Sequence, residues 1–174
     1  ELSYNNRVID FNKGIGYTEK DWGKNFPNSW IWVQANHFNK SKISISASMA
    51  SIPFLGTQFA GFIIGLLVED KLYRFTTYRS AKTVKLKHDG KAIEWIVKLK
   101  DLTLSIYIEL GNKVGLLFAP DENDMIEKVP EYLDSRVSIK LEDSNKIIIE
   151  DKSNLAANEV IGDIDTLLQL VNKQ

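Results

Sequence analysis

The segment YTEKDWGKNFPNSWIWVQANHF, residues 17–38, decides how the rest of this 174-residue chain is interpreted. It contains Trp22, Trp30 and Trp32, which are three of the four tryptophans in the sequence. Because large aromatic side chains are costly to leave in water, this dense group predicts burial, either in a core or around a ligand.

Residues 30–38 have high strand propensity and no helical spacing, so they predict a β-strand. Alternation along that strand places four large side chains on one face: Trp30, Trp32, Gln34 and Asn36. The opposite, mostly apolar face holds Ile31, Val33, Ala35 and His37. Two indoles with two carboxamides suit the wall of a pocket for an apolar molecule with a polar end. The alternative is a core filled by the tryptophans, with the amides at its rim.

The same segment resembles the tocopherol cyclase family, whose members carry runs of the form E-K-x-W-G, F-P and W-x-W-x-Q-x-N. The matching positions are Glu19, Lys20, Trp22, Gly23, Phe26, Pro27, Trp30, Trp32, Gln34 and Asn36. A second segment, EDKSNLAANEV at residues 150–160, is similar to the family's E-x-K-S-x-x-A-A-x-E. Its matches are Glu150, Lys152, Ser153, Ala156, Ala157 and Glu159. KLYRF at residues 71–75 also looks like the family's hairpin.

The resemblance implies a lipocalin-like barrel that encloses an apolar ligand, often present as two barrels in tandem. Family members are longer, and the matched runs belong to their C-terminal portion, whereas this chain begins at Glu1. We therefore expect residues 1–174 to form one lipocalin-like β domain, the C-terminal part of a longer two-barrel protein. An N-terminal barrel of the same protein, or a second copy of the chain, is then a possible partner.

The composition excludes several classes of function. A formal net charge of −1 argues against nucleic-acid binding, and the lack of cysteine excludes disulfides and zinc–thiolate sites. With only His37 and His88, far apart in the chain, no metal site is predicted. The longest apolar run, residues 59–68, is shorter than the roughly 20 residues that a membrane-spanning helix needs. No signal peptide is recognised, so we expect a soluble, cytoplasmic protein.

Strand patterns and turn residues predict an all-β fold. The expected strands are residues 7–11, 16–20, 30–38, 43–50, 59–68, 72–79, 84–87, 92–100, 102–110, 114–118, 136–141, 146–151 and 155–161. Residues 21–28 are expected to be a loop, residues 119–132 a surface excursion, and residues 164–171 a helix capped by Asp163. Gly61 and Gly65 indicate a curving strand or a close backbone approach. The fold class is an antiparallel lipocalin-like barrel or curved sandwich of about ten strands with a short C-terminal helix.

Three further strands show clear alternation. Residues 93, 95, 97 and 99, and residues 102, 104, 106 and 108, are apolar and are expected to face the core. In residues 43–50, serines 44, 46 and 48 alternate with apolar residues. That serine side faces either solvent, which we favour, or a ligand.

The reaction that the resemblance implies is ring closure of a prenylated hydroquinone to a chromanol. A proton is added to an alkene, a tertiary carbocation develops, and the phenol oxygen captures it. This chemistry needs a buried proton donor, aromatic faces that stabilise the cation and a polar group for the quinol head, but no metal or redox cofactor. Standard nucleophile, phosphate-loop and zinc motifs are absent from the sequence.

Residue chemistry supplies the candidates for these roles. The candidate acids are Glu19, Asp21 and Glu159, and the candidate ligand-binding residues are Trp22, Trp30, Trp32, Gln34 and Asn36. Glu159 has an alternative interpretation as half of a salt bridge with Lys20 or Arg74. His37 is interpreted as a core or edge histidine. The apolar partner is a prenyl quinol or a lipid, and the chain is a cyclase-like enzyme, a non-catalytic carrier or a structural half-barrel that needs its N-terminal partner.

Overall fold

The computed structural model describes residues 2–22, 24–40, 42–121 and 124–173, so Gly23 of the first family-like run lies outside the described residues. The strands are β1 (Leu2–Tyr4), β2 (Arg7–Ile9), β3 (Trp30–Ala35), β4 (Ile43–Phe54), β5 (Thr57–Val68), β6 (Lys71–Thr76), β7 (Lys82–His88), β8 (Ala92–Leu99), β9 (Leu102–Glu109), β10 (Val114–Asp121), β11 (Asp124–Asp143) and β12 (Lys146–Ile161). A 3₁₀ turn, η1 (Thr77–Arg79), follows β6, and one helix, α1 (Ile164–Asn172), follows β12.

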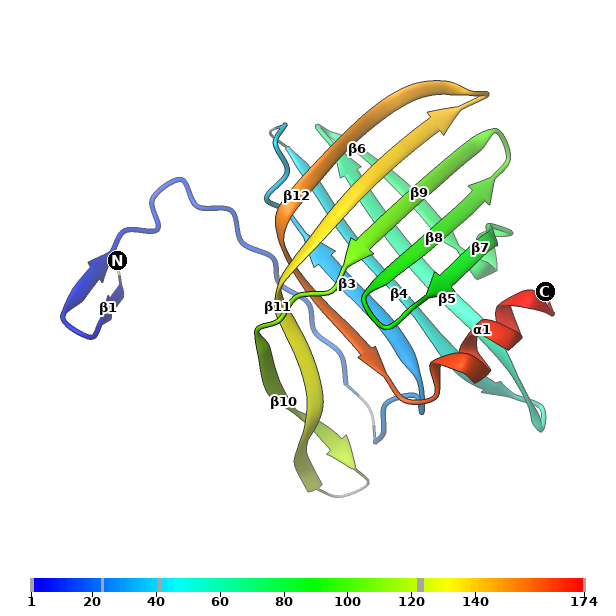
Figure 1. Ribbon diagram of the computed structural model, residues 1–174, viewed down its shortest axis with the longest axis horizontal. Coiled ribbons are helices and arrows are strands. Elements are labelled where there is room, and N and C mark those ends of the chain that lie inside the picture. Colours follow the sequence, from blue (N-terminus) through cyan, green and yellow to red (C-terminus); the bar gives the residue numbers. More distant parts are fainter. Residues whose placement is uncertain (1, 23, 41, 122–123, 174) are drawn as a thin grey trace.

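In the part of the chain that the structure describes, ten strands form one antiparallel sheet. Its order is β6-β5-β4-β3-β12-β11-β9-β8-β7, with β10 paired to β11 alone. No pairing joins the end strands β6 and β7 over these residues, so the sheet is not a closed barrel. It curves until its two halves face each other, and α1 lies at the open side, against β4, β5 and β7 (Figure 1). The prediction of an antiparallel, curved β protein with a C-terminal helix is therefore confirmed.

The inner face of the curved sheet, defined as the face turned toward the opposite half, holds the main hydrophobic core. Alternating residues of β3, β4, β5, β8, β9 and β11 point into it, as the alternation of residues 92–109 predicted for β8 and β9. The rings of Phe62 on β5 and Trp95 on β8 meet edge to face, with centroids 5.9 Å apart. Strands from the two halves of the sheet therefore pack directly against each other, and the interior is filled by side chains.

Helix α1 closes the open side of this core. Asp163 accepts a hydrogen bond from the backbone N–H of Thr166 at 2.9 Å, as predicted for the N-cap. The side chains of Ile164, Leu167 and Val171 are buried against the sheet. Their spacing of three and four residues puts all three on one face of the helix.

Residues 119–132 were expected to be a surface excursion, but residues 119–121 and 124–132 instead lie on the two strands of a long β hairpin, the β10–β11 ribbon (Figure 1). Pro120 and Pro130 favour a surface excursion in the sequence, because proline has no N–H to donate to a β ladder. Within the described part of the sheet, Pro120 lies on β10, which pairs on one edge only, and such an edge tolerates a residue without an N–H. Pro130 pairs with Leu116 but lies beyond the last register pair of β11 with β12, Glu131 with Glu159.

Of the two N-terminal predictions, the strand at residues 7–11 is confirmed over Arg7–Ile9, whereas the strand at residues 16–20 was wrong. β1 and β2 form a small hairpin that stands away from the sheet (Figure 1), and residues 16–20 form no strand. A short extended segment becomes a strand only where a neighbour offers backbone partners, which propensity does not report. Residues 17–21, here called the strap, are held to the sheet by side chains instead.

Some strand ends differ from the predictions. β3 stops at Ala35, so His37 lies beyond the ladder and is exposed rather than on the apolar face. Residues 77–79 turn into η1, whereas residues 146–161 form the single strand β12 instead of two. Gly61 lies where an added Cβ would come within 2.9 Å of Ile52, so side-chain crowding accounts for this glycine.

Candidate carboxylate–indole site

Sheet register assembles the candidate site on the outer face of β3, the face opposite the main core. Trp32 lies directly between Glu159 on β12 and Ser48 on β4, and Gln34 lies between Ala157 and Ser46. Trp30, Trp32 and Gln34 share this face because they alternate with the fully buried Ile31 and Val33. Two segments of the chain separated by more than a hundred residues thus meet at the tryptophans.

Glu159 is half-buried and accepts a hydrogen bond from the indole nitrogen of Trp30, with Nε1 to Oε2 at 2.6 Å. Burial raises the pKa of Glu159, the bond from Trp30 lowers it, and the negative charges of Glu131, Glu19 and Asp21 raise it further. The net direction is upward from the ordinary value of 4.5. Glu159 is therefore a carboxyl group that retains its proton at higher pH than a solvated glutamate does.

Glu19 on the strap has a parallel arrangement with the second tryptophan. The indole nitrogen of Trp32 donates to Glu19 Oε2 at 3.4 Å, and Ser46 Oγ lies 3.3 Å from the same oxygen. The Tyr17 hydroxyl is hydrogen-bonded to Glu19 and lies 2.9 Å from Ser46 Oγ. These contacts hold the strap across β3 and β4, with each of the two indole N–H groups directed at a carboxylate.

The remaining ionisable groups make this surface locally acidic. Burial and the neighbouring Glu19 raise the pKa of Tyr17 to about 12. The pKa of Asp21 is raised by burial, by the charge of Glu19 and by a hydrogen bond with it. Burial raises the pKa of Glu131, which is the register partner of Glu159. Because carboxyl groups this close resist ionising together, the site favours at least one protonated carboxyl.

The β10–β11 ribbon covers part of the site. Ala119 of β10 and Val129 of β11 are buried against Trp30 in a small second hydrophobic cluster, joined at its edge by Phe26 and Ile161. The rings of Phe26 and Trp30 meet edge to face with centroids 5.8 Å apart. The outer face of the sheet is therefore apolar around Trp30 although it is acidic beside it.

A pocket of about 390 Å³ opens next to this cluster. It is lined by Asn25, Phe26, Pro27, Asn28, Trp30, Lys128 and Ile161. Glu159 is not part of this lining and is connected to the pocket through its hydrogen bond with Trp30. A wider groove of about 640 Å³ lies on β8, β9, β11 and β12, lined in part by Glu94, Tyr107 and Lys152.

Several predicted site residues have surroundings or partners other than those predicted. Trp22 is 83% exposed, with the Lys20 ammonium 5.9 Å from its ring centroid, so the prediction that all three clustered tryptophans are buried was wrong. Asn36 follows the end of β3, and Nε2 of Gln34 is buried without a hydrogen-bond partner. Glu159 has Trp30 as its hydrogen-bond partner rather than Lys20 or Arg74.

Other residues of the site were missed. Tyr17 lies two positions before Glu19 in an extended segment, so alternation could have placed both on one side. Ser46 was on the serine side of its strand, which is half-buried and partly covered by the strap rather than simply open to solvent. Glu131 could not have been found, since only the register of β11 with β12 brings it to Glu159.

Two classes of site receive no support from the described residues. In the ranges that the structure covers, no group of three or more His, Cys, Asp or Glu side chains is arranged to hold a metal ion. Over the same ranges, no helix has the length and apolar character to cross a membrane.

The fold and site define an open, strongly curved antiparallel β protein whose outer face directs carboxyl groups at indole nitrogens. The chain belongs to the tocopherol cyclase-like family, since the family model described as "Tocopherol cyclase-like" matches residues 1–162. This confirms the family resemblance drawn from the two sequence runs.

Two plant proteins are similar to this chain. One is named "Probable tocopherol cyclase, chloroplastic" from Oryza sativa subsp. japonica, with 26% identity over 174 residues, covering 92% of this chain and 36% of that protein. The other is named "Tocopherol cyclase, chloroplastic" from Zea mays, with 26% identity over 81 residues, covering 44% of this chain and 17% of that protein. The chain thus spans only about a third of the rice protein. No solved structure matches it significantly.

Proposed function

We propose that this chain binds a prenylated hydroquinone, or a similar isoprenoid, beside Trp30 and closes its ring by acid catalysis with Glu159 as the proton donor. The single observation that carries the proposal is the half-buried Glu159, with its raised pKa, hydrogen-bonded to an indole that also lines a pocket. Alkene protonation requires a proton donor, and a carboxyl group whose pKa is raised by burial keeps its proton to a higher pH than a solvated one does.

The proposed reaction is an isomerisation in which all atoms are retained. The Glu159 proton forms a bond to one alkene carbon, using the alkene π electrons, and leaves a tertiary cation on the other carbon. A lone pair of the phenol oxygen then forms the new C–O bond. The phenol proton passes to the Glu159 carboxylate, which restores the acid.

The aromatic residues give the cation its environment. The Trp30 and Phe26 rings both line the pocket, and they are the aromatic groups proposed to stabilise the cation there. A cation over a desolvated aromatic face is stabilised by about 2 kcal/mol. Asn25 and Asn28, rather than the predicted Gln34 and Asn36, are the amides that line this pocket and are proposed to contact the quinol head.

The test is to incubate the purified chain with a prenylated hydroquinone in detergent, without oxygen or added cofactor, and to quantify chromanol by liquid chromatography. We expect product with the wild type and at least about a hundredfold less with Glu159→Gln, because the amide keeps the shape but has no acidic proton. Glu150→Gln, an exposed position on the same strand, is the matched control and is expected to retain full activity.

A second function, a non-catalytic carrier of isoprenoids or lipids, is favoured by the pocket lining, which includes no carboxylate among its described residues. Tight binding of the hydroquinone without product, unchanged in Glu159→Gln, would select the carrier and reject the cyclase.

The chain's place in a longer protein is also a proposal. Because the rice relative is nearly three times as long as its matched part, we propose that a preceding lipocalin-like barrel completes the protein. Absence of both binding and product in this chain, with both restored when the preceding part is added, would select the half-barrel interpretation. The cytoplasmic location stays a prediction.

A further inference from the structure

The β10–β11 ribbon is joined to the sheet at a corner formed by residues 133–135. Side chains of this corner accept three hydrogen bonds from the backbone of residues 111–113. β11 pairs with β9 from Arg136 onward and with β10 up to Tyr132, so the change of partner falls on residues 133–135. Opposite β12, the register shifts on both sides of Ser135. Paired irregularities of this kind bend and twist a strand locally, so this corner sets the direction of the ribbon.

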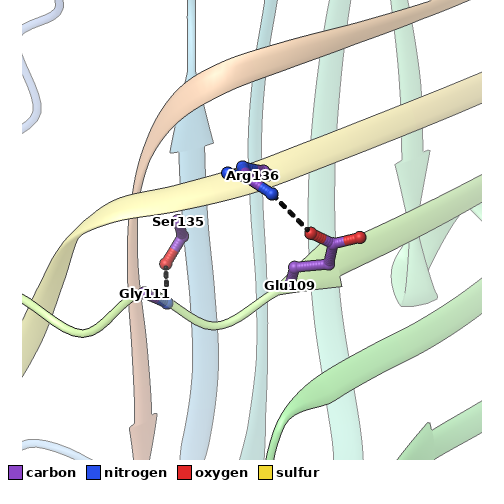
Figure 2. Close-up of polar contacts among 4 residues, drawn as sticks. All are labelled: Glu109, Gly111, Ser135 and Arg136. Carbon is purple, nitrogen blue, oxygen red and sulfur yellow. Dashed lines mark hydrogen bonds and ion pairs between the residues drawn. The ribbon is translucent and has the colours of Figure 1, made fainter.

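Two adjacent side chains fix the linker between β9 and β10 at this corner. Ser135 Oγ accepts from the backbone N–H of Gly111 at 2.9 Å, directly beside the Arg136–Glu109 pair at the end of β9 (Figure 2). Asp134 Oδ1 accepts from the backbone N–H groups of Asn112 at 2.9 Å and Lys113 at 2.8 Å. These bonds from Lys113 and Asn112 hold the pKa of Asp134 below its usual range.

The same corner is connected to the candidate site. The fully buried Ser135 hydroxyl donates to Oδ1 of the fully buried Asn158, the residue directly before Glu159. An added Cβ at Gly111 would overlap the Asp134 carboxylate, so the linker and the corner are in close contact. The Ser135 hydroxyl thus joins Gly111 to Asn158. Because it is buried, losing it would leave both partners without a hydrogen bond and out of reach of water.

The ribbon supplies three of the groups that define the surroundings of Glu159. Ala119 and Val129 cover Trp30, and Glu131 brings a negative charge to the register position opposite Glu159. All three belong to the ribbon and lie beyond the corner. Any movement of the ribbon therefore hydrates Trp30 and moves Glu131 at the same time.

We propose that Ser135, Asp134 and Gly111 are positioning residues, which hold the β10–β11 ribbon against Trp30 and beside Glu159. They touch neither the pocket nor the proposed acid, and act through the ribbon and through Asn158. Their importance for chemistry rests on the proposed function, whereas the positioning itself is measurable in the free protein without ligand or turnover.

The test follows the Trp30 indole N–H signal by ¹H–¹⁵N NMR as the pH is changed, with Trp30→Phe identifying the signal. Because this N–H is bonded to Glu159, its chemical shift reports protonation of that carboxyl. In Ser135→Ala and Asp134→Ala the midpoint pH of the Trp30 signal change is expected to fall toward that of a solvated glutamate. The ribbon would then no longer exclude water from Glu159. Ser138→Ala, an exposed position on the same strand, is expected to titrate like the wild type.

A second measurement separates positioning from loss of fold. Amide exchange in the ribbon should accelerate about tenfold or more in Asp134→Ala, while β4 and β5 stay as protected as in the wild type. Asp134→Asn keeps an acceptor oxygen and should restore both readouts. If Ser135→Ala does not fold, Asp134→Ala decides alone, because its side chain is only partly buried. A folded Asp134→Ala with a wild-type midpoint and wild-type exchange would overturn the proposal, whatever the cyclase assay shows.

Discussion

The two faces of β3 have different surroundings, although neighbouring residues of this six-residue strand point to opposite faces. Inward, Ile31, Val33 and Ala35 are completely or almost completely buried in the core between the two halves of the sheet. Outward, Trp30 and Trp32 direct their indole nitrogens at Glu159 and Glu19. The inner face stabilises the folded protein, because it removes apolar area from water. The outer face contains carboxyl groups whose burial disfavours ionisation.

The inner face of β3 is therefore linked to stability, and the outer face to titration and binding. On the inner face the Trp95 indole donates to Thr83 at 3.0 Å, whereas Nδ2 of the buried Asn158 has no hydrogen-bond partner among the described residues. The outer face holds buried polar atoms with no partner, such as Gln34 Nε2, next to carboxyl groups with raised pKa values. We therefore expect substitutions inside to change unfolding and substitutions outside to change titration and binding.

The largest expected effect is on the inner face. Trp95→Ala removes a fully buried indole that packs on Phe62, and should lower the free energy of unfolding by about 3–5 kcal/mol, because a large cavity remains. Urea unfolding measures this. Trp22→Ala, at an exposed position, should change it by less than about 0.5 kcal/mol. Similar losses in both variants would contradict the assignment of the core.

The next effect tests how the helix covers the inner core. Asp163→Ala removes the acceptor for the Thr166 N–H and should lower the free energy of unfolding by less than Trp95→Ala does, because one helix cap is lost and no cavity forms. The pKa of Asp163 is lowered by the same bonds, so its contribution should disappear as the pH falls through its folded-state pKa. Thermal unfolding over a pH series measures both. Asp165→Ala, which lies in the first turn without capping, is the matched control, and an equal loss there would argue against the cap.

On the outer face the sign of the pH dependence is reversed. Because the pKa of Glu159 is raised in the folded protein, the folded state binds this proton more tightly than the unfolded state does. Stability from Glu159 is therefore complete below the ordinary value of 4.5 and declines as the pH rises through the folded-state pKa. Glu159→Gln should flatten this decline relative to the wild type. A steeper decline in the variant would show that Glu159 is stabilised as a carboxylate.

The smallest effect concerns the strap. Tyr17→Phe removes the hydroxyl bonded to Glu19 and Ser46, and should cost about 0.5 kcal/mol or less, because the ring remains partly exposed. Limited proteolysis should cut the strap faster in this variant, with the sheet unaffected. Tyr78→Phe, at an exposed position outside the strap, should be cut at the wild-type rate. Equal rates in both would mean that the hydroxyl does not hold the strap.

The sequence predicted the inner face better than the outer one. Alternation was sufficient for Trp95 and Ile106, because one buried face leaves a local period-2 pattern. The pairing of β10 with β11 was missed since Pro120 is tolerated on an edge strand, and whether a strand lies at an edge depends on the whole sheet. Propensity alone likewise could not show that residues 16–20 lack a backbone partner.

For the site, residue chemistry selected Glu19, Glu159 and both sheet tryptophans, but the sequence did not indicate which would meet. The meeting of Glu159 with Trp30 depends on the pairing of β12 with β3, and Glu131 joins through β11. Sheet register over such separations is set by global packing, not by neighbouring residues. Motif order suggested that the two runs belong together, without giving any contact.

The pairing of β3 with β12 has a consequence for how the chain is made. Residues 30–35 leave the ribosome long before residues 157–161, yet each completes the other's ladder. Until then β3 has only β4 as a hydrogen-bonded neighbour among the described strands, and the tryptophans stay uncovered. Contacts this distant in sequence slow folding, so a nascent chain should depend on chaperones until β12 has emerged.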